Sequence, residues 1–239
     1  MVDLDTIPST RIEWPRAARI VRAPSRRVDH FDDIGDPADW PHLVAAERAT
    51  SPTFAEGVGD YRALPADRHA TGRGAHHLMK PFTHVSRDRP IRFSDGSFGV
   101  LYAARTFEAA LFETVYHHGR FMAATQQTSG WTSQFLEIAL DIDASLHDLR
   151  NLGRRTNSIL DPADHGAGQK LGSELHASGS NGIVYPSVRL VGGECSALFY
   201  PRLGRNVREL RYLDYHWDGS RVDLYRELES GEVYRITGG

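Results

Sequence analysis

The segment RFSDGSFGVLYAARTFEAALFETVYH, residues 92–117, decides the fold because it joins a turn, a strand and a helix in direct succession. Ser94-Asp-Gly96 is typical of a turn, and the apolar run Gly99–Ala104 predicts a short buried strand. Thr106 is a suitable N-cap for a helix predicted over Phe107–His118. A buried strand is thus expected to lead directly into a helix that carries polar side chains.

The rest of the chain predicts strands and helices without a regular alternation. Strands are expected at 19–22, 135–142, 183–185 and 197–200, helices at 36–47 and 171–175, and a hairpin at 222–228 and 233–236 with its turn at Ser230-Gly231. Residues 50–90 are rich in Gly, Pro and polar side chains, and short helices are expected there because so long a structureless stretch is uncommon. This mixture indicates an α+β fold rather than a doubly wound sheet.

Composition indicates an ordinary globular protein. The chain has 239 residues with 40% hydrophobic and 25% charged residues, which suits one domain with its own core. Its net charge of −3 argues against a nucleic-acid or membrane-surface binder that works by bulk electrostatics. The single cysteine, Cys195, excludes an internal disulfide framework, and no signal peptide or membrane-spanning run is seen. A cytoplasmic location is therefore expected.

Glu113 and His117 form the first candidate pair for chemistry. They are four residues apart, so a helix places them on one face within reach of each other. A surface pair is the plain alternative. The small or apolar neighbours Ala109, Ala110 and Phe112 favour a functional role, because a carboxylate among such residues is costly to bury without a partner or a task.

Ser187 is the second candidate, because it directly follows the predicted strand at 183–185 and Pro186. It lacks the Gly-x-Ser-x-Gly context of a nucleophile elbow, so a hydrolase-type serine is not expected. Two interpretations remain open: a serine at the edge of a cleft, or a strand-terminal serine that binds backbone groups.

Histidines are frequent, with 12 in the chain, but no metal site is expected. The doublets His76-His77 and His117-His118 are predicted to point to opposite sides of their elements, and no His-Glu-x-x-His pattern occurs.

From about Arg19 to Pro201 the chain resembles the RES-domain family. Its Pro81–His84 block precedes the Arg-Phe-Ser-Asp-Gly-Ser run, as in longer members. Residues of this chain that match the family pattern are Arg92, Tyr102, Glu113, His117 and the pair Pro186-Ser187, with Arg19 where an early arginine is expected. The chain departs from shorter members at Glu194-Cys195-Ser196, and no residue is carried over from that turn.

The resemblance implies a single RES-type domain over 1–239, with a core at about 15–203 and a C-terminal hairpin extension at 204–239. RES proteins are toxins of bacterial toxin–antitoxin pairs with a mixed β core flanked by helices, similar to ADP-ribosyltransferase toxins. They attack the nicotinamide–ribose bond of NAD+ and pass ADP-ribose to water, phosphate or a protein. Their antitoxins bind DNA and cover the toxin's active site.

The matched residues suit that reaction. Glu113 would stabilise an oxocarbenium-like centre, or orient the 2′-hydroxyl and the nucleophile. Arg92 and Arg19 would hold the pyrophosphate, and Tyr102 would stack on the nicotinamide or ribose. Ser187 would hydrogen-bond the substrate, and His117 would fix the glutamate rotamer.

Three hypotheses follow. The first is a toxin that hydrolyses or phosphorolyses NAD+, with NADP+ as a further substrate. The others are a mono-ADP-ribosyltransferase that modifies a host protein, and a non-catalytic partner of a regulator. NAD+ would be substrate and not a retained cofactor, since no Gly-x-Gly-x-x-Gly follows a strand. The expected partner is a cognate antitoxin with a DNA-binding domain, with a homodimer within their complex as one option. Nucleic acid and membranes are not expected as direct partners.

Overall fold

The structure of the protein is a computed structural model, and residues 6–23 and 64–237 of it are described. The strands are β1 (Ser9–Arg22), β2 (Leu101–Ala104), β3 (Gly130–Asp148), β4 (Gly182–Pro186), β5 (Glu194–Leu198), β6 (Gly204–Trp217), β7 (Val222–Glu227) and β8 (Val233–Arg235). The helices are α3 (Ala75–Thr83), α4 (Phe107–Thr125) and α5 (Gly166–Ala177), with short 3-10 turns η4 (Ala66–Arg68), η5 (Gly153–Thr156) and η6 (Pro201–Leu203).

The strands form one sheet in the order β1-β2-β5-β4-β3-β6-β7-β8, and β1 also pairs with β3. This second pairing closes β1, β2, β5, β4 and β3 into a ring. β3 and β4 run parallel, whereas the other pairs formed by the described strands are antiparallel. A mixed β core flanked by helices was expected, and this architecture confirms the α+β class.

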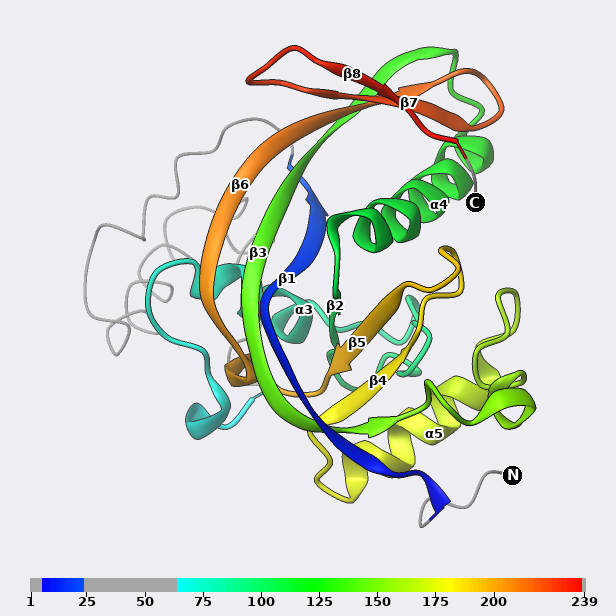
Figure 1. Ribbon diagram of the computed structural model, residues 1–239. Helices are drawn as coiled ribbons and strands as arrows, with labels where there is room; N and C mark the ends of the chain where they lie inside the picture. Colours follow the sequence, from blue (N-terminus) through cyan, green and yellow to red (C-terminus); the bar gives the residue numbers. More distant parts are fainter. Residues whose placement is uncertain (1–5, 24–63, 238–239) are drawn as a thin grey trace.

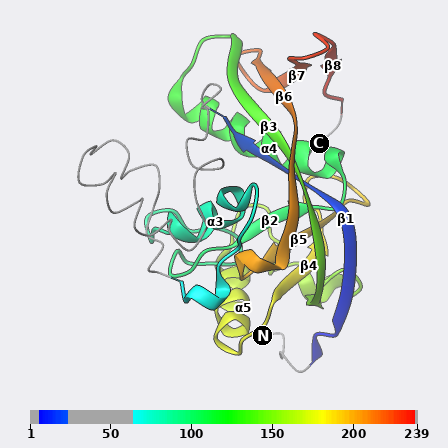
Figure 2. The same cartoon turned by 90° about the vertical axis from the view of Figure 1, so that its left-hand side faces the viewer.

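Three long strands, β1, β3 and β6, give the molecule its shape. Figure 1 shows them as a curved arc with α4 on its concave side, and Figure 2 shows them from the outer side of the arc. The ladders contain register shifts, one between β1 and β3 and three between β3 and β6. Such irregularities bend and twist a strand, which accounts for the curvature.

Helix α4 begins where the local sequence predicts. The Thr106 side chain accepts a hydrogen bond from the Ala109 backbone N–H at 3.3 Å, so this residue is the N-cap. The helix extends beyond the predicted end at His118 to Thr125. It packs against β1 and β7, which places its inner face toward the core.

Helix α5 lies directly on the segment before β2. A Cβ on Gly172 would lie 2.0 Å from the Phe93 carbonyl oxygen, and one on Gly168 would lie 2.6 Å from the Arg92 carbonyl oxygen. Gln169 Nε2 also donates to the Ile91 carbonyl at 3.1 Å. The two glycines therefore bring the helix against the backbone of the segment that carries Arg92.

Several predictions of secondary structure are confirmed with longer bounds. The strands expected at 19–22, 135–142 and 183–185 belong to β1, β3 and β4, and the hairpin at 222–236 forms β7 and β8. The short helices expected within 50–90 include η4 and α3. The helix predicted at 36–47 lies outside the described residues.

Other predictions were wrong in detail. Residues 199–200 follow β5 rather than belonging to it, because β5 covers Glu194–Leu198. β6 was not predicted, because its sequence is rich in charged residues and most of its side chains are partly or fully exposed. Among the described residues, no helix is both long and apolar enough to cross a membrane.

Candidate active site

Glu113 and Ser187 are in direct contact, although 74 positions separate them. The Ser187 hydroxyl donates to Glu113 Oε1 at 2.9 Å. Ser187 Oγ itself accepts the backbone N–H groups of Arg189 and Leu190, each at 3.1 Å. The interpretation of Ser187 as a serine that binds backbone groups is confirmed, and its hydroxyl also orients the carboxylate on α4; its place at the edge of a cleft stays a prediction.

His117 does not make that contact. Within the described residues, the hydrogen bond to the Glu113 carboxylate comes from Ser187, and none joins it to His117. The His117 side chain is exposed, and its ring lies 5.4 Å from that of Tyr116. The rotamer-fixing role predicted for His117 therefore falls to Ser187.

Tyr102 faces the same region from β2. Its hydroxyl oxygen accepts the Phe93 backbone N–H at 3.1 Å, and the two rings stack at 6.5 Å between centroids. Burial raises the pKa of Tyr102 well above its ordinary value, so the phenol stays protonated at neutral pH. It offers a flat, neutral surface and a hydroxyl.

The two predicted arginines are held by backbone carbonyls. Arg92 is buried, and its Nη1 donates to the Asp161 carbonyl at 2.8 Å. Arg19 Nη1 donates to the Tyr102 carbonyl at 2.7 Å, while its buried Nε has no hydrogen-bond partner among the described residues. Burial lowers the pKa of Arg19 to about 10, so it remains charged at neutral pH. Arg19 thus ties β1 to the strand that carries Tyr102.

Positive charge gathers near Glu113. Although His117 reaches the surface, its pKa is lowered to about 4, first because neighbouring protein atoms displace part of the water around the ring and then by the charges of Arg189, His165, Arg92 and Arg120. Burial, followed by Arg92 and Arg189, also lowers the pKa of His165. Arginines that oppose protonation of two histidines would equally favour an anion, so this region is suited to bind phosphate groups.

Sequence reasoning missed Arg189. Its guanidinium carbon lies 3.3 Å from the centroid of the Tyr116 ring, and Nη2 donates to the Pro162 carbonyl at 3.1 Å. Its Nε is buried, and in the part of the chain that the structure describes it has no hydrogen-bond partner. Its position two residues after Ser187 could have indicated that Arg189 belongs to the site. Its stacking on Tyr116 of α4 could not be predicted from the sequence.

Cys195 is a second residue that the sequence did not indicate. It is buried on β5, and the nearby Ser187 and Glu113 side chains both act on its thiol. Burial, and then the negative charge of Glu113, raises the pKa of Cys195 to about 12. The thiol is therefore protonated at neutral pH and forms part of the wall behind the carboxylate.

The histidine doublets differ from each other. His117 is exposed while His118 is buried 5.0 Å from the Phe135 ring, so this doublet diverges as expected. The His76 and His77 rings instead lie 3.8 Å apart, and the prediction that they point to opposite sides was wrong. They lie in the first turn of α3, against β6.

Comparison with known proteins identifies the family. The RES domain family model matches residues 61–218, which is more than half of the chain. Comparison with curated protein sequences gives no match. Among solved structures, the chain is similar to the crystal structure of the M. tuberculosis MbcT–MbcA toxin–antitoxin complex, with a TM-score of 0.42 and 11% sequence identity, over 87% of this chain and 89% of that chain. On the family match, this chain belongs to the RES domain family.

Proposed function

We propose that this protein is a toxin that cleaves the nicotinamide–ribose bond of NAD+. The observation that carries the proposal is the Glu113 carboxylate, which accepts a hydrogen bond from Ser187, together with Arg92 and Arg189, whose charges both act on His117 of the same helix. RES membership supports the same substrate class. A dinucleotide with a positively charged glycosidic centre and an anionic pyrophosphate matches this pairing of carboxylate and arginines.

The reaction follows from the charges. The C1′–N bond breaks, and its electron pair goes to the pyridine nitrogen, so nicotinamide leaves neutral without a general acid. Glu113 stabilises the positive charge that develops on the ribose. Water then attacks C1′ and releases a proton, which gives ADP-ribose; phosphate or a protein side chain would take the same position in the alternative outcomes.

Each neighbouring residue has a role in this scheme. Ser187 holds the carboxylate in place, and Tyr102 supplies a neutral surface for the nicotinamide or ribose. Arg92 and Arg189 hold the pyrophosphate. Arg19 fixes the backbone of Tyr102, which makes it a positioning residue.

A cytoplasmic enzyme that consumes NAD+ endangers its host, so a protein inhibitor is part of the proposal. The arginines near Glu113 would accept a carboxylate of such an antitoxin in place of pyrophosphate, which blocks NAD+ by competition. DNA binding would belong to that partner, since this chain has a net charge of −3.

The decisive experiment incubates the purified protein with NAD+, with and without phosphate or a bacterial lysate, and identifies products by mass. Free ADP-ribose indicates hydrolysis, its phosphate ester indicates phosphorolysis, and labelled protein indicates ADP-ribosylation. If the wild-type protein releases no nicotinamide, the proposed chemistry is wrong. Expression in bacteria, with NAD+ and growth followed over time, then tests toxicity: normal growth with normal NAD+ would leave a non-catalytic binding role.

A further inference from the structure

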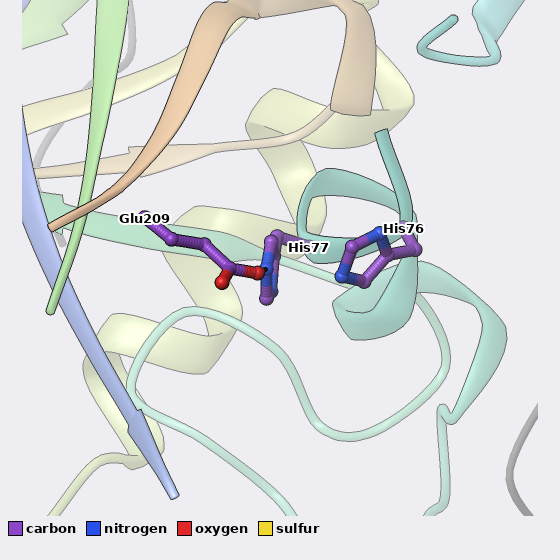
Figure 3. A group of neighbouring side chains, drawn as sticks. All are labelled: His76, His77 and Glu209. Carbon is purple, nitrogen blue, oxygen red and sulfur yellow. Dashed lines mark hydrogen bonds and ion pairs between the residues drawn. The ribbon is translucent and has the colours of Figure 1, made fainter. Parts of the chain in front are cut away.

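Three potential metal ligands converge away from the candidate active site. His76 and His77 belong to the first turn of α3, and Glu209 belongs to β6 (Figure 3). His77 Nε2 lies 2.7 Å from Glu209 Oε1, and the two imidazole centroids are 3.8 Å apart. One ligand atom from each residue lies within 4.8 Å of the other two.

The backbone explains why residues so far apart in sequence meet. Gly74 precedes α3 with φ +74°, and a Cβ at this position would lie 2.8 Å from the Val207 side chain on β6. Glycine therefore lets the start of the helix approach the strand closely. Val207 and Glu209 are two residues apart on the strand, so they share the face that meets the helix.

The donor set selects a class of ion. Two imidazoles and a carboxylate suit zinc and neighbouring divalent transition metals, whereas calcium and magnesium prefer oxygen ligands alone. The exposed fraction is 12% for the His77 side chain and 46% for that of Glu209, so the cluster reaches solvent on the Glu209 side.

We propose that His76, His77 and Glu209 bind one divalent transition-metal ion of the zinc class, with water as the fourth ligand. The ion would replace the hydrogen bond between His77 and Glu209 and would join α3 to β6. Its role is structural and does not depend on NAD+ cleavage. The alternative is an ion pair between His77 and Glu209 with no metal, and the experiment must distinguish this pair from a bound ion.

The test uses the full chain without a histidine tag, treated with chelator and dialysed. Isothermal titration with Zn2+ should show one equivalent bound per chain, with a dissociation constant in the micromolar range or tighter. Co2+ should give the visible absorption of a tetrahedral site. His76→Gln, His77→Gln and Glu209→Gln should each weaken binding by about tenfold or more, whereas His84→Gln, at the end of the same helix, should not.

Thermal unfolding is a second measurement, which reports the effect of the ion on stability as well as its binding. Saturating Zn2+ should raise the melting temperature of the wild-type protein and of His84→Gln, because an ion that binds only the folded state stabilises it. The rise should be lost in Glu209→Gln, whose partly exposed side chain can change without loss of the fold. The proposal is wrong if the wild-type chain binds no Zn2+, or if it binds Zn2+ equally well in all three ligand variants.

Discussion

Glu113 provides the charge on which the proposed cleavage depends, and glutamine at this position keeps the shape while removing that charge. Glu113→Gln should lower the rate of NAD+ cleavage by about 10²–10³, the scale seen when one such electrostatic contact is lost. Nicotinamide release measures the rate. Glu108→Gln is the matched control, because Glu108 is exposed on the same helix. An unchanged rate in Glu113→Gln would exclude the mechanism.

We expect Arg92 and Arg189 to hold the pyrophosphate of the substrate and not to act on the ribose, where the bond breaks. Phosphate contacts exist in the ground state and the transition state alike, so Arg92→Ala and Arg189→Ala should raise KM more than they lower kcat. Loss of one charge-assisted contact corresponds to roughly a 10- to 100-fold rise in KM. Arg221→Ala is the control, because the Arg221 side chain is 69% exposed in the turn between β6 and β7. A fall in kcat at constant KM would place either arginine at the ribose.

His118 makes stability depend on pH. Burial, and then the charge of Arg22, lowers its pKa from 6.5 to about 4. Between these values the unfolded chain binds a proton that the folded chain does not, so stability falls as the pH decreases from 6.5 to 4. The loss is on the order of 3 kcal/mol. Urea unfolding measures the free energy of unfolding near neutral pH and near pH 4. This free energy should decrease less between the two pH values in His118→Gln than in the wild-type protein. An equal decrease in both proteins would contradict the prediction.

At the scale of elements, the contact between α5 and the Arg92 segment should be sensitive to a single methyl group. Gly172→Ala would press a Cβ against the Phe93 carbonyl at 2.0 Å, so it should cost about 1–3 kcal/mol of stability and raise KM by displacing Arg92. Gly119→Ala on α4 is the matched control, since a Cβ there would lie 3.9 Å from its nearest neighbour, the Trp217 ring. It should stabilise by about 0.5–1 kcal/mol through helix propensity. Thermal unfolding measures both, and equal effects of the two substitutions would refute this packing argument.

At the scale of the whole molecule, β1 lies outside the matched residues 61–218 but completes the sheet. It pairs with β3 from Ser9 to Arg22 and buries Ile12, Trp14 and Ile20. A fragment of residues 61–239, which lacks β1 but keeps β7 and β8, would expose the edges of β2 and β3, so it should aggregate or lack a cooperative unfolding transition. A fragment of residues 6–239 should melt like the full chain. A sharp transition in the shorter fragment would show that β1 is dispensable.

Short-range features could be predicted from sequence because their causes lie within a few residues. The Thr106 cap, the helix after β2 and the β7–β8 hairpin depend on local capping, apolar runs and the turn glycine Gly231, whose φ is +73°. The residues Arg92, Tyr102, Glu113 and Ser187 were found by a family pattern with fixed spacing. Their roles in NAD+ cleavage remain predictions.

Long-range pairing decided the rest. The first half of β1 was not predicted, because Pro15 lacks a backbone N–H and disfavours a strand. In the structure Pro15 lies within the register shift between Trp14 and Ala17, where the missing N–H is tolerated. β6 is a strand because β3 provides its hydrogen-bond partners, not because its charged sequence prefers one. The Ser187–Glu113 bond, the Arg189–Tyr116 stack and the approach of His77 to Glu209 join distant segments. Such contacts exist only after the sheet has closed, since no local interaction brings these side chains together.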